Sequence, residues 1–329
     1  MALPTSPFAV SSSIPGNGEI RVSLLQPGQQ VLTTCKYQYP LKLVAPDPHP
    51  HQAGDDKGVT VVFLLTYGGG LVGGDKLSLD VELEPSTQLV LVTLGSTKLF
   101  KCASRSVVSS QTMDVKIGAG AALCYLPDPT QPFAQSVYEQ RQTFYVDPKG
   151  TSSLLMLDWV SEGRSALGES WQLWEWKGRN EVRSLDETAS RGRGRGRLLL
   201  RDAFTLSDEG AGGIGLAQKT DGMGVLGTLI IYGPVFEKLG AFFIKHMAEQ
   251  PRIGIKNFSD IDSIKVDGPY SVQEKDDGLL WTAANVRGFV LVKFGAKGVD
   301  GARQWLGRLL KAEGTVERQF GHQALLCFR

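Results

Sequence analysis

Two glutamates, Glu162 and Glu169, lie seven residues apart and flank Arg164 in the segment EGRSALGE. Paired carboxylates can act as acid and base in a hydrolase when a substrate cleft holds them about 5–10 Å apart. No nucleophile motif of the GxSxG type accompanies them, and an ion pair with Arg164 explains the same three charges without catalysis. The residues alone therefore leave two alternatives open, a carboxylate-dependent hydrolase site and a structural ion pair.

Two histidines, His49 and His51, lie in a proline-rich segment that also contains aspartates. Imidazole suits nickel and zinc, so the pair is a candidate for metal binding. Two ligands on an extended loop make a weak site, and solvent-exposed loop histidines are the favoured interpretation. Their role stays open at this point.

A glycine-rich run, GGGLVG at residues 68–73, fits the GxGxxG pattern of dinucleotide-binding loops. Such a loop must open a helix, because the helix N-terminus holds the pyrophosphate. Here Gly74 and Asp75 follow, and then the alternating segment Lys76–Leu83. The run is therefore predicted to form a sharp bend between strands, not a nucleotide site.

An arginine–glycine run, Arg191–Arg197, lies in a basic segment at residues 177–201. RNA binding through this run would require aromatic residues between the arginines for base stacking, and these are missing. The whole chain has 35 basic and 34 acidic residues, which argues against a dedicated nucleic-acid or membrane-surface protein. We expect residues 177–201 to be a solvated basic loop inserted between strands.

The elements that position these residues are predicted to be mainly strands. The chain has 329 residues, 42% of them hydrophobic, and its 39 glycines separate short apolar runs. Residues 1–20 are expected to form a flexible arm, and Tyr37–Val44 a first strand that Pro40 limits to a sheet edge. The segment Ser78–Glu84 alternates apolar and polar residues, which is typical of a half-buried antiparallel strand. Further strands are expected at Val59–Tyr67, Lys76–Leu83, Leu89–Leu94, Met113–Ile117, Ala122–Leu126, Gln140–Val146 and Leu154–Val160.

Helical periodicity is confined to the C-terminal third. Apolar residues recur at helical spacing over Val235–Met247, directly after Gly233 and Pro234. A second helix is expected over Val299–Ala312, with Gly314 just beyond its end. Strands rarely alternate with helices, so the pattern favours a β-rich fold over a parallel α/β fold.

Cellular setting is indicated by what the sequence lacks. The four cysteines are far apart and include no CxxC pair, so neither a disulfide scaffold nor a zinc site is expected. No apolar run approaches the roughly 18 residues of a membrane-spanning helix, and the N-terminus lacks a signal-peptide pattern. We expect a cytoplasmic protein.

Several strings taken together resemble the family of the urease accessory protein UreD, also called UreH. They occur in the family's order and extend the resemblance from about Tyr37 to the end of the chain. Lys293 stands where the family pattern has arginine, and the N-terminal arm and residues 177–201 are not covered. The strings are Tyr67–Leu77, Leu91–Lys101, Leu126–Ala134, Glu162–Glu169, Gly288–Gly295 and Gly301–Leu310.

The resemblance implies one β-rich domain over residues 21–329, built as a helix-like stack of antiparallel and mixed sheets. It implies no catalysis. The family acts as a scaffold that binds apo-urease and, through the accessory protein UreF, recruits the GTPase UreG. Ni²⁺ passes through an internal polar tunnel to urease, so no cofactor is tightly bound and nickel is present only in transit.

Matching to the family motifs also assigns roles to residues. Asp75 and Glu169 are expected to face the nickel tunnel, followed by Glu162 and Asp158, because carboxylates bind a passing metal more weakly than a Cys/His cage would. Arg164 is expected to shape the scaffold together with Gly69, Gly70, Gly73, Gly74 and Gly168.

The resemblance implies that the UreF surface lies partly in the C-terminal region, where Trp305, Leu306 and Leu309 are candidate anchors. From the residues alone, the favoured interpretation is that these three residues pack the helix onto the chain's own sheet.

Overall fold

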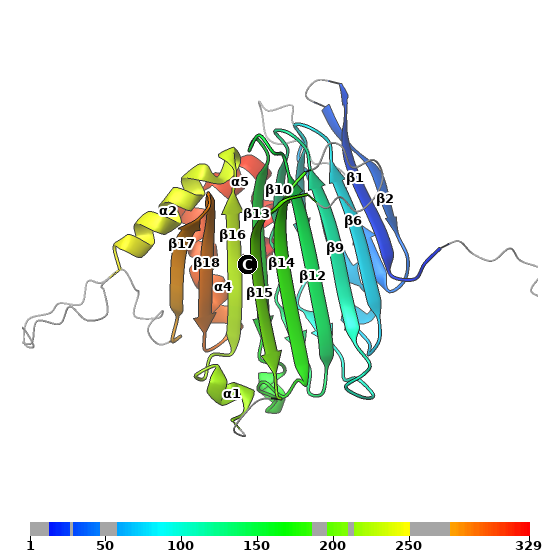
Figure 1. Cartoon of the computed structure of the whole chain (residues 1–329), viewed down its shortest axis with the longest axis vertical. Helices are drawn as coiled ribbons and strands as arrows, with labels where there is room; N and C mark the ends of the chain where they lie inside the picture. The colour runs from blue at the N-terminus through cyan, green and yellow to red at the C-terminus, as the bar shows by residue number, and fades with distance from the viewer. Residues whose placement is uncertain (1–12, 27–28, 47–57, 186–195, 210–213, 251–276) are drawn as a thin grey trace, which may run out of the picture.

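The computed structural model describes residues 13–26, 29–46, 58–185, 196–209, 214–250 and 277–329. Two large sheets face each other, and helices lie beside and behind them (Figure 1). The expected mainly β fold, with its few helices mostly in the C-terminal third, is confirmed.

The first sheet has seven strands and forms one wall of the core. Their order across the sheet is β15 (Leu198–Ser207), β14 (Glu175–Ser184), β12 (Val137–Val146), β9 (Ser109–Ile117), β6 (Lys76–Leu83), β1 (Asn17–Gln26) and β2 (Gln29–Tyr37).

The second sheet forms the opposite wall. Its main path is β17 (Leu280–Val286), β18 (Phe289–Ala296), β16 (Val225–Tyr232), β13 (Ser153–Ser161), β10 (Ala122–Tyr125), β7 (Gln88–Val92), β4 (Thr60–Thr66) and β3 (Leu41–Val44). The short strands β5 (Gly70–Leu71), β8 (Thr97–Leu99) and β11 (Thr130–Pro132) branch from this path.

The chain winds between the sheets as a coil. It runs from the second sheet through a short strand to the first sheet three times in succession, as β4–β5–β6, β7–β8–β9 and β10–β11–β12, and then passes from β13 to β14. Equivalent strands of successive coils pair in parallel, as β6 does with β9 and β7 does with β10. This arrangement is the expected helix-like stack of sheets.

The direction of β6 differs from the prediction. Ser78–Glu84 was expected to be antiparallel, but β6 pairs in parallel with both β1 and β9. Its alternating burial is as expected, since Leu79, Val81 and Leu83 are buried. Alternation reports that one face of a strand is covered, and it carries no information on the direction of the neighbouring strand.

The helices cover the outer face of the second sheet. The 3₁₀ turn η3 (Pro234–Phe236) leads into α2 (Glu237–Ala248), and α4 (Val299–Glu313), α5 (Thr315–Phe320) and the 3₁₀ segment η4 (His322–Phe328) follow β18. A shorter helix, α1 (Leu216–Lys219), precedes β16. Both predicted helices are confirmed, and Gly314, at φ +80°, ends α4 as expected.

The helical layer gives the second sheet two buried faces. Leu154 and Met156 of β13 belong to the core between the sheets. Leu155 and Leu157 belong to a second core under the helices.

The N-terminal boundaries also differ from those predicted. β1 begins at Asn17, so residues 17–20, which were expected to belong to the arm, lie in a strand with Ile20 fully buried. The predicted first strand is divided, because Tyr37 ends β2 and Leu41 begins β3, with Pro40 in the turn between them. Proline cannot donate to a ladder, which explains why one strand does not run through it.

The basic segment is not one inserted loop. Residues 177–184 belong to β14 and residues 198–201 to β15, which pair as antiparallel neighbours. The basic side chains make this strand look like a loop in the sequence, although they alternate with the buried residues Trp176, Asn180 and Val182. Residues 186–195, with most of the arginine–glycine run, and His49 and His51 lie outside the described residues.

Candidate functional site

Four of the six sequence strings of the family resemblance lie at equivalent corners of successive coils, and the other two, Gly288–Gly295 and Gly301–Leu310, lie on β18 and in α4. Residues 67–77 follow β4, residues 91–101 span the end of β7, residues 126–134 follow β10, and residues 162–169 follow β13. The short strands stack these corners, with Gly70 paired to Lys98 and Thr97 paired to Thr130. Segments far apart in the sequence thus form one end of the coil.

The first corner contains the glycine-rich run and Asp75. Gly69 and Gly74 adopt φ +73° and +93°, which only glycine accepts readily. The run leads into β5 and then β6, so the predicted strand-to-strand bend is confirmed. The Asp75 carboxylate accepts a hydrogen bond from the Val72 backbone N–H at 2.9 Å and so closes the turn.

The fourth corner contains the paired glutamates. Arg164 donates from Nε to Glu169 Oε2 at 2.9 Å and from Nη2 to Glu169 Oε1, and this guanidinium holds the pKa of Glu169 below its ordinary value. Glu162 accepts a hydrogen bond from Ser170 Oγ at 2.6 Å. The geometry matches the ion-pair alternative.

Asp158 lies in a different place, between the two sheets. It shares the inward face of β13 with Leu154, Met156 and Val160, all of them buried core residues. Gln140 Nε2 donates to Asp158 Oδ1 at 2.9 Å, and Asn180 Nδ2 donates to Asp158 Oδ2 at 2.7 Å, both from the first sheet. Burial raises the pKa of Asp158, although the two amide donors oppose that shift.

Polar residues form a band across the inner faces of both sheets at this level. In the second sheet, Asp158 pairs in register with Thr228, and Thr228 pairs with Lys293. In the first sheet, Gln142 pairs with Asn180, and Asn180 pairs with Asp202. We call these six residues the polar band.

An ion pair joins the two rows of the polar band. Lys293 Nζ lies 2.6 Å from Asp202 Oδ1 and 3.3 Å from Thr228 Oγ1. Asp202 belongs to the first sheet and Lys293 to the second, so the pair bridges the gap between the sheets.

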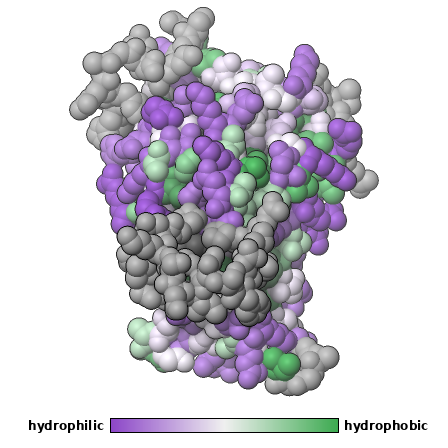
Figure 2. Space-filling view, turned by 90° about the vertical axis from the view of Figure 1, so that its left-hand side faces the viewer, coloured by the Kyte–Doolittle hydropathy of each residue, from purple (hydrophilic) through white to green (hydrophobic). Residues whose placement is uncertain are grey.

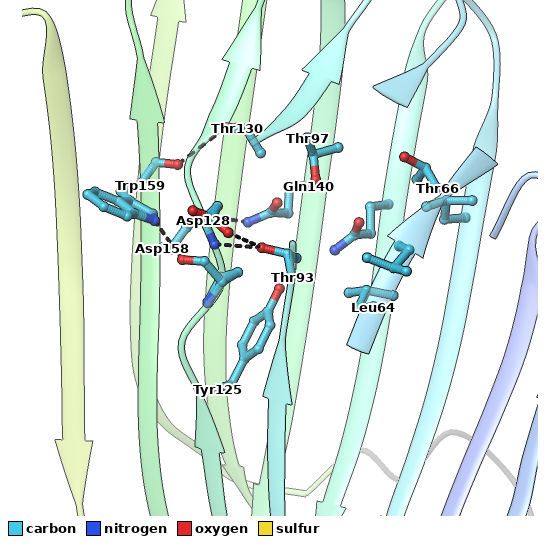
Figure 3. Close-up of a pocket in the computed structure, with 14 residues that line it drawn as sticks. Leu64, Thr66, Thr93, Thr97, Tyr125, Asp128, Thr130, Gln140, Asp158 and Trp159 are labelled. Carbon is cyan, nitrogen blue, oxygen red and sulfur yellow. Dashed lines mark hydrogen bonds between the residues drawn. The ribbon is translucent and has the colours of Figure 1, made fainter. Parts of the chain in front are cut away.

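Two cavities share Asp158 in their linings. The smaller, of about 30 Å³, extends from Asp158 toward the corners of the coil, and Figure 3 shows Thr93, Tyr125 and Asp128 along its wall. The larger, of about 160 Å³, extends from Asp158 past Asn180 to Asp202 and Lys293. Both volumes exceed the roughly 10–15 Å³ that one water molecule needs.

Two buried oxygens of the polar band lack a partner. Gln142 Oε1 and Asn180 Oδ1 make no hydrogen bond to the described part of the chain, and their side chains are 1% and 2% exposed. Buried polar atoms are nearly always satisfied by protein, water or an ion. Water or an ion is the usual partner of such atoms.

The comparison with known families settles the family of the chain. Residues 16–327 match the family described as UreD urease accessory protein. The chain belongs to the UreD family. It is 31% identical to a UreD-like urease accessory protein of Schizosaccharomyces pombe over 94% of this chain and 98% of the relative. It is 27% identical to urease accessory protein 4 of Cryptococcus neoformans, covering 92% and 91% of the two chains, and 28% identical to UreD of an Anaeromyxobacter species, covering 90% and 84%.

Membership of the UreD family gives this chain a role in urease maturation. Within the described ranges, no helix is long and apolar enough to cross a membrane. On the side of the molecule seen in Figure 2, the atoms drawn in colour are mostly hydrophilic, with hydrophobic residues in small separate groups.

The site residues expected from the resemblance are not brought together in this UreD-family chain. Asp158 borders both cavities, whereas Asp75, Glu162 and Glu169 border neither. Across the described residues, no three His, Cys, Asp or Glu side chains form a group able to hold a metal. The polar band instead combines two carboxylates, Asp158 and Asp202, with two amides, a hydroxyl and the Lys293 ammonium.

Sequence reasoning missed Gln140, Asn180 and Asp202. A local signal exists for Asp158, the one polar residue among the inward positions of an apolar strand. The corresponding signal for Asn180 is hidden, because its strand has three basic residues, Lys177, Arg179 and Arg183, on the opposite face.

The three residues expected to anchor UreF are buried in the chain's own core. Trp305, Leu306 and Leu309 of α4 are at most 4% exposed and pack among residues of the second sheet and η4. This corrects the partner anchors carried over from the family and agrees with the interpretation favoured from the residues, in which they hold the helix on the sheet. A hydrophobic face that is already covered has no area left for a partner.

Proposed function

We propose that this UreD-family protein is a non-catalytic scaffold that binds apo-urease and, together with UreF and the GTPase UreG, delivers Ni²⁺ to urease. Family membership supports the role in urease maturation. The polar band supports the nickel part of the proposal, because it places a carboxylate and unpartnered oxygens inside an otherwise apolar core.

The chemistry of the polar band suits transit of a metal. Ni²⁺ would meet carboxylate, amide and hydroxyl oxygens together with water, and never a set of imidazoles or thiolates. Oxygen donors bind Ni²⁺ less tightly than nitrogen or sulfur donors, so the ion can leave toward its target. The two cavities that share Asp158 are the proposed path through the gap between the sheets.

The hydrolase alternative receives no comparable support. Glu169 is engaged by Arg164, and Glu162 is engaged by Ser170. Neither carboxylate borders either of the two cavities. The ion pair explains these residues without a reaction.

A cytoplasmic setting belongs to the same proposal. All four cysteines are free, and three of them, Cys102, Cys124 and Cys327, are buried. Unpaired buried cysteines suit a reducing compartment, where thiols stay reduced.

A reconstituted maturation assay tests the proposal. Apo-urease, UreF, UreG, GTP and Ni²⁺ are incubated with the parent protein or with Asp158→Asn, and nickel per urease is measured by mass spectrometry. We expect Asp158→Asn to slow nickel loading by roughly tenfold, a change of about 1.4 kcal/mol, while the complex still assembles. The matched control is Glu139→Gln, on the outer face of β12, which pairs with Arg141 at 3.0 Å.

Two results would contradict the proposal. Normal loading by an Asp158→Asn complex that assembles fully would exclude nickel transit past Asp158. Full loading of urease without this chain would exclude the scaffold role.

A further inference from the structure

The polar band contains one positively charged side chain, Lys293, to which the proposed passage of nickel assigns no role. Lys293, on β18, lines the larger cavity but not the smaller one, which lies nearer the coil corners. The Lys293 side chain is 48% exposed, whereas its partner Asp202 is 11% exposed. Lys293 therefore stands where the polar band reaches solvent.

The contacts of Lys293 are those that a metal ion would make. Its Nζ lies 2.6 Å from a carboxylate oxygen of Asp202 and 3.3 Å from the hydroxyl of Thr228. Carboxylate and hydroxyl oxygens bind divalent cations and ammonium groups alike, since both are positive. The Lys293 ammonium thus fills a position that a metal cation could occupy.

A second observation points to a ligand beside this position. Asn180 is in register with Asp202, lines the same cavity, and is 2% exposed, yet its Oδ1 has no partner. The Asn180 Nδ2 is already used, because it donates to Asp158 at 2.7 Å. An amide oxygen left free next to two carboxylates offers a third donor for a cation.

We propose that Lys293 is a resident cation that closes the entrance of the polar band and that an entering divalent metal displaces it from Asp202. This inference rests on the proposed function, since it describes how the same passage is regulated. In the closed state, the ammonium neutralises Asp202. In the open state, the metal takes the oxygens of Asp202, Thr228 and Asn180, and the lysine moves into solvent.

The side chain of Lys293 is suited to this exchange. Its four-carbon stem is flexible and half-exposed, so the ammonium can leave the gap without movement of β18. A positive charge at the entrance lowers the affinity for Ni²⁺, because two cations within a few ångströms repel each other strongly at low dielectric. Weak binding at the entrance keeps the passage from trapping its cargo.

Ni²⁺ binding to the purified full-length protein tests the inference without urease. Equilibrium dialysis with nickel chloride compares the parent protein with Lys293→Met, which keeps the apolar stem and removes the charge. We expect the variant to bind Ni²⁺ roughly tenfold more tightly and to release it more slowly to a chelator. Lys293→Arg should behave like the parent protein, because it retains the positive charge.

The matched control is Lys177→Met. Lys177 is 49% exposed and pairs with Glu175 at 2.7 Å, so it resembles Lys293 in exposure and pairing but lies on the outer face of β14. We expect no change in Ni²⁺ affinity. A second variant, Asp202→Asn, should weaken Ni²⁺ binding in the Lys293→Met background, because it removes the carboxylate that the metal would take.

Failure of this inference is distinct from failure of the proposed function. If Lys293→Met binds Ni²⁺ as Lys177→Met does, Lys293 is a structural ion-pair partner only, and the inference is wrong whatever Asp158→Asn does to urease loading. If Asp158→Asn loads urease normally while Lys293→Met still tightens Ni²⁺ binding, the cation site stands and the transit role falls.

Discussion

Arg303 of α4 donates from Nη2 to Asp128 Oδ1 at 3.0 Å and so ties the helical layer to the corner of the third coil. The same carboxylate accepts from Thr93 Oγ1 at 3.0 Å and from the Gly95 backbone N–H at 2.8 Å. Asp128 therefore joins two successive coils and one helix. It also lines the smaller cavity, so the position of α4 bears directly on the wall of that cavity.

Removal of Arg303 should destabilise the fold. Arg303→Met leaves the Asp128 carboxylate, 8% exposed, without its counter-charge, and breaking such a buried pair costs about 3–5 kcal/mol. Urea denaturation measures the free energy of unfolding. Arg21→Met is the control, because Arg21 and Glu82 form an ion pair at 2.7 Å with both side chains more than 40% exposed, and we expect less than about 1 kcal/mol. Equal losses in the two variants would contradict the role of the Asp128 contact.

Ionisation of Asp158 should lower the free energy of unfolding as the pH rises. Burial raises its pKa above the ordinary value of 3.8, so the folded state binds this proton more tightly than the unfolded state does. The ionised carboxylate therefore costs stability above the folded-state pKa and costs nothing below pH 3.8. We expect the free energy of unfolding of Asp158→Asn, relative to that of the parent, to increase as the pH rises through this window. Urea denaturation of both proteins across that pH range measures this difference. A difference in free energy of unfolding that did not change with pH would contradict the raised pKa of Asp158.

The Arg164–Glu169 ion pair should raise the free energy of unfolding as the pH rises. The hydrogen bond from Arg164 lowers the pKa of Glu169 below its ordinary value of 4.5. Its contribution is present above pH 4.5 and is lost as the pH falls through the folded-state pKa. Glu169→Gln should therefore be less stable than the parent at neutral pH and equal to it in strong acid. Thermal unfolding at a series of pH values measures this, and we expect normal urease loading by the variant.

Trp305 should contribute to the stability of the isolated chain, because it is a core residue. Trp305→Ala removes a side chain that is 2% exposed and contacts the rings of Trp281 and Phe294, at a cost of about 3–5 kcal/mol. Denaturation of the isolated chain reports this loss with no partner present. Lys311→Ala, on the exposed side of the same helix, should change stability by less than about 0.5 kcal/mol. If Trp305→Ala were as stable as the parent and lost only complex formation, Trp305 would be a partner anchor after all.

Local patterns in the sequence determined the elements and the class of fold. The strand at Lys76–Leu83 and the end of the helix before Gly314 follow from side-chain alternation and from glycine at positive φ. These signals act over a few residues, so they survive without knowledge of the fold. They fail where surface charge dominates, as in the strand that contains Asn180.

Tertiary structure alone decided which residues share a site. Asp158 meets Asn180 across the gap between the sheets, and Lys293 meets Asp202 from 91 positions away in the chain. Alternation predicts that a side chain points inward, but it does not predict which residue of the facing sheet lies opposite. That residue depends on how the coil winds. The sequence thus contained each member of the polar band, and only the stacking of the coils brought them within bonding distance.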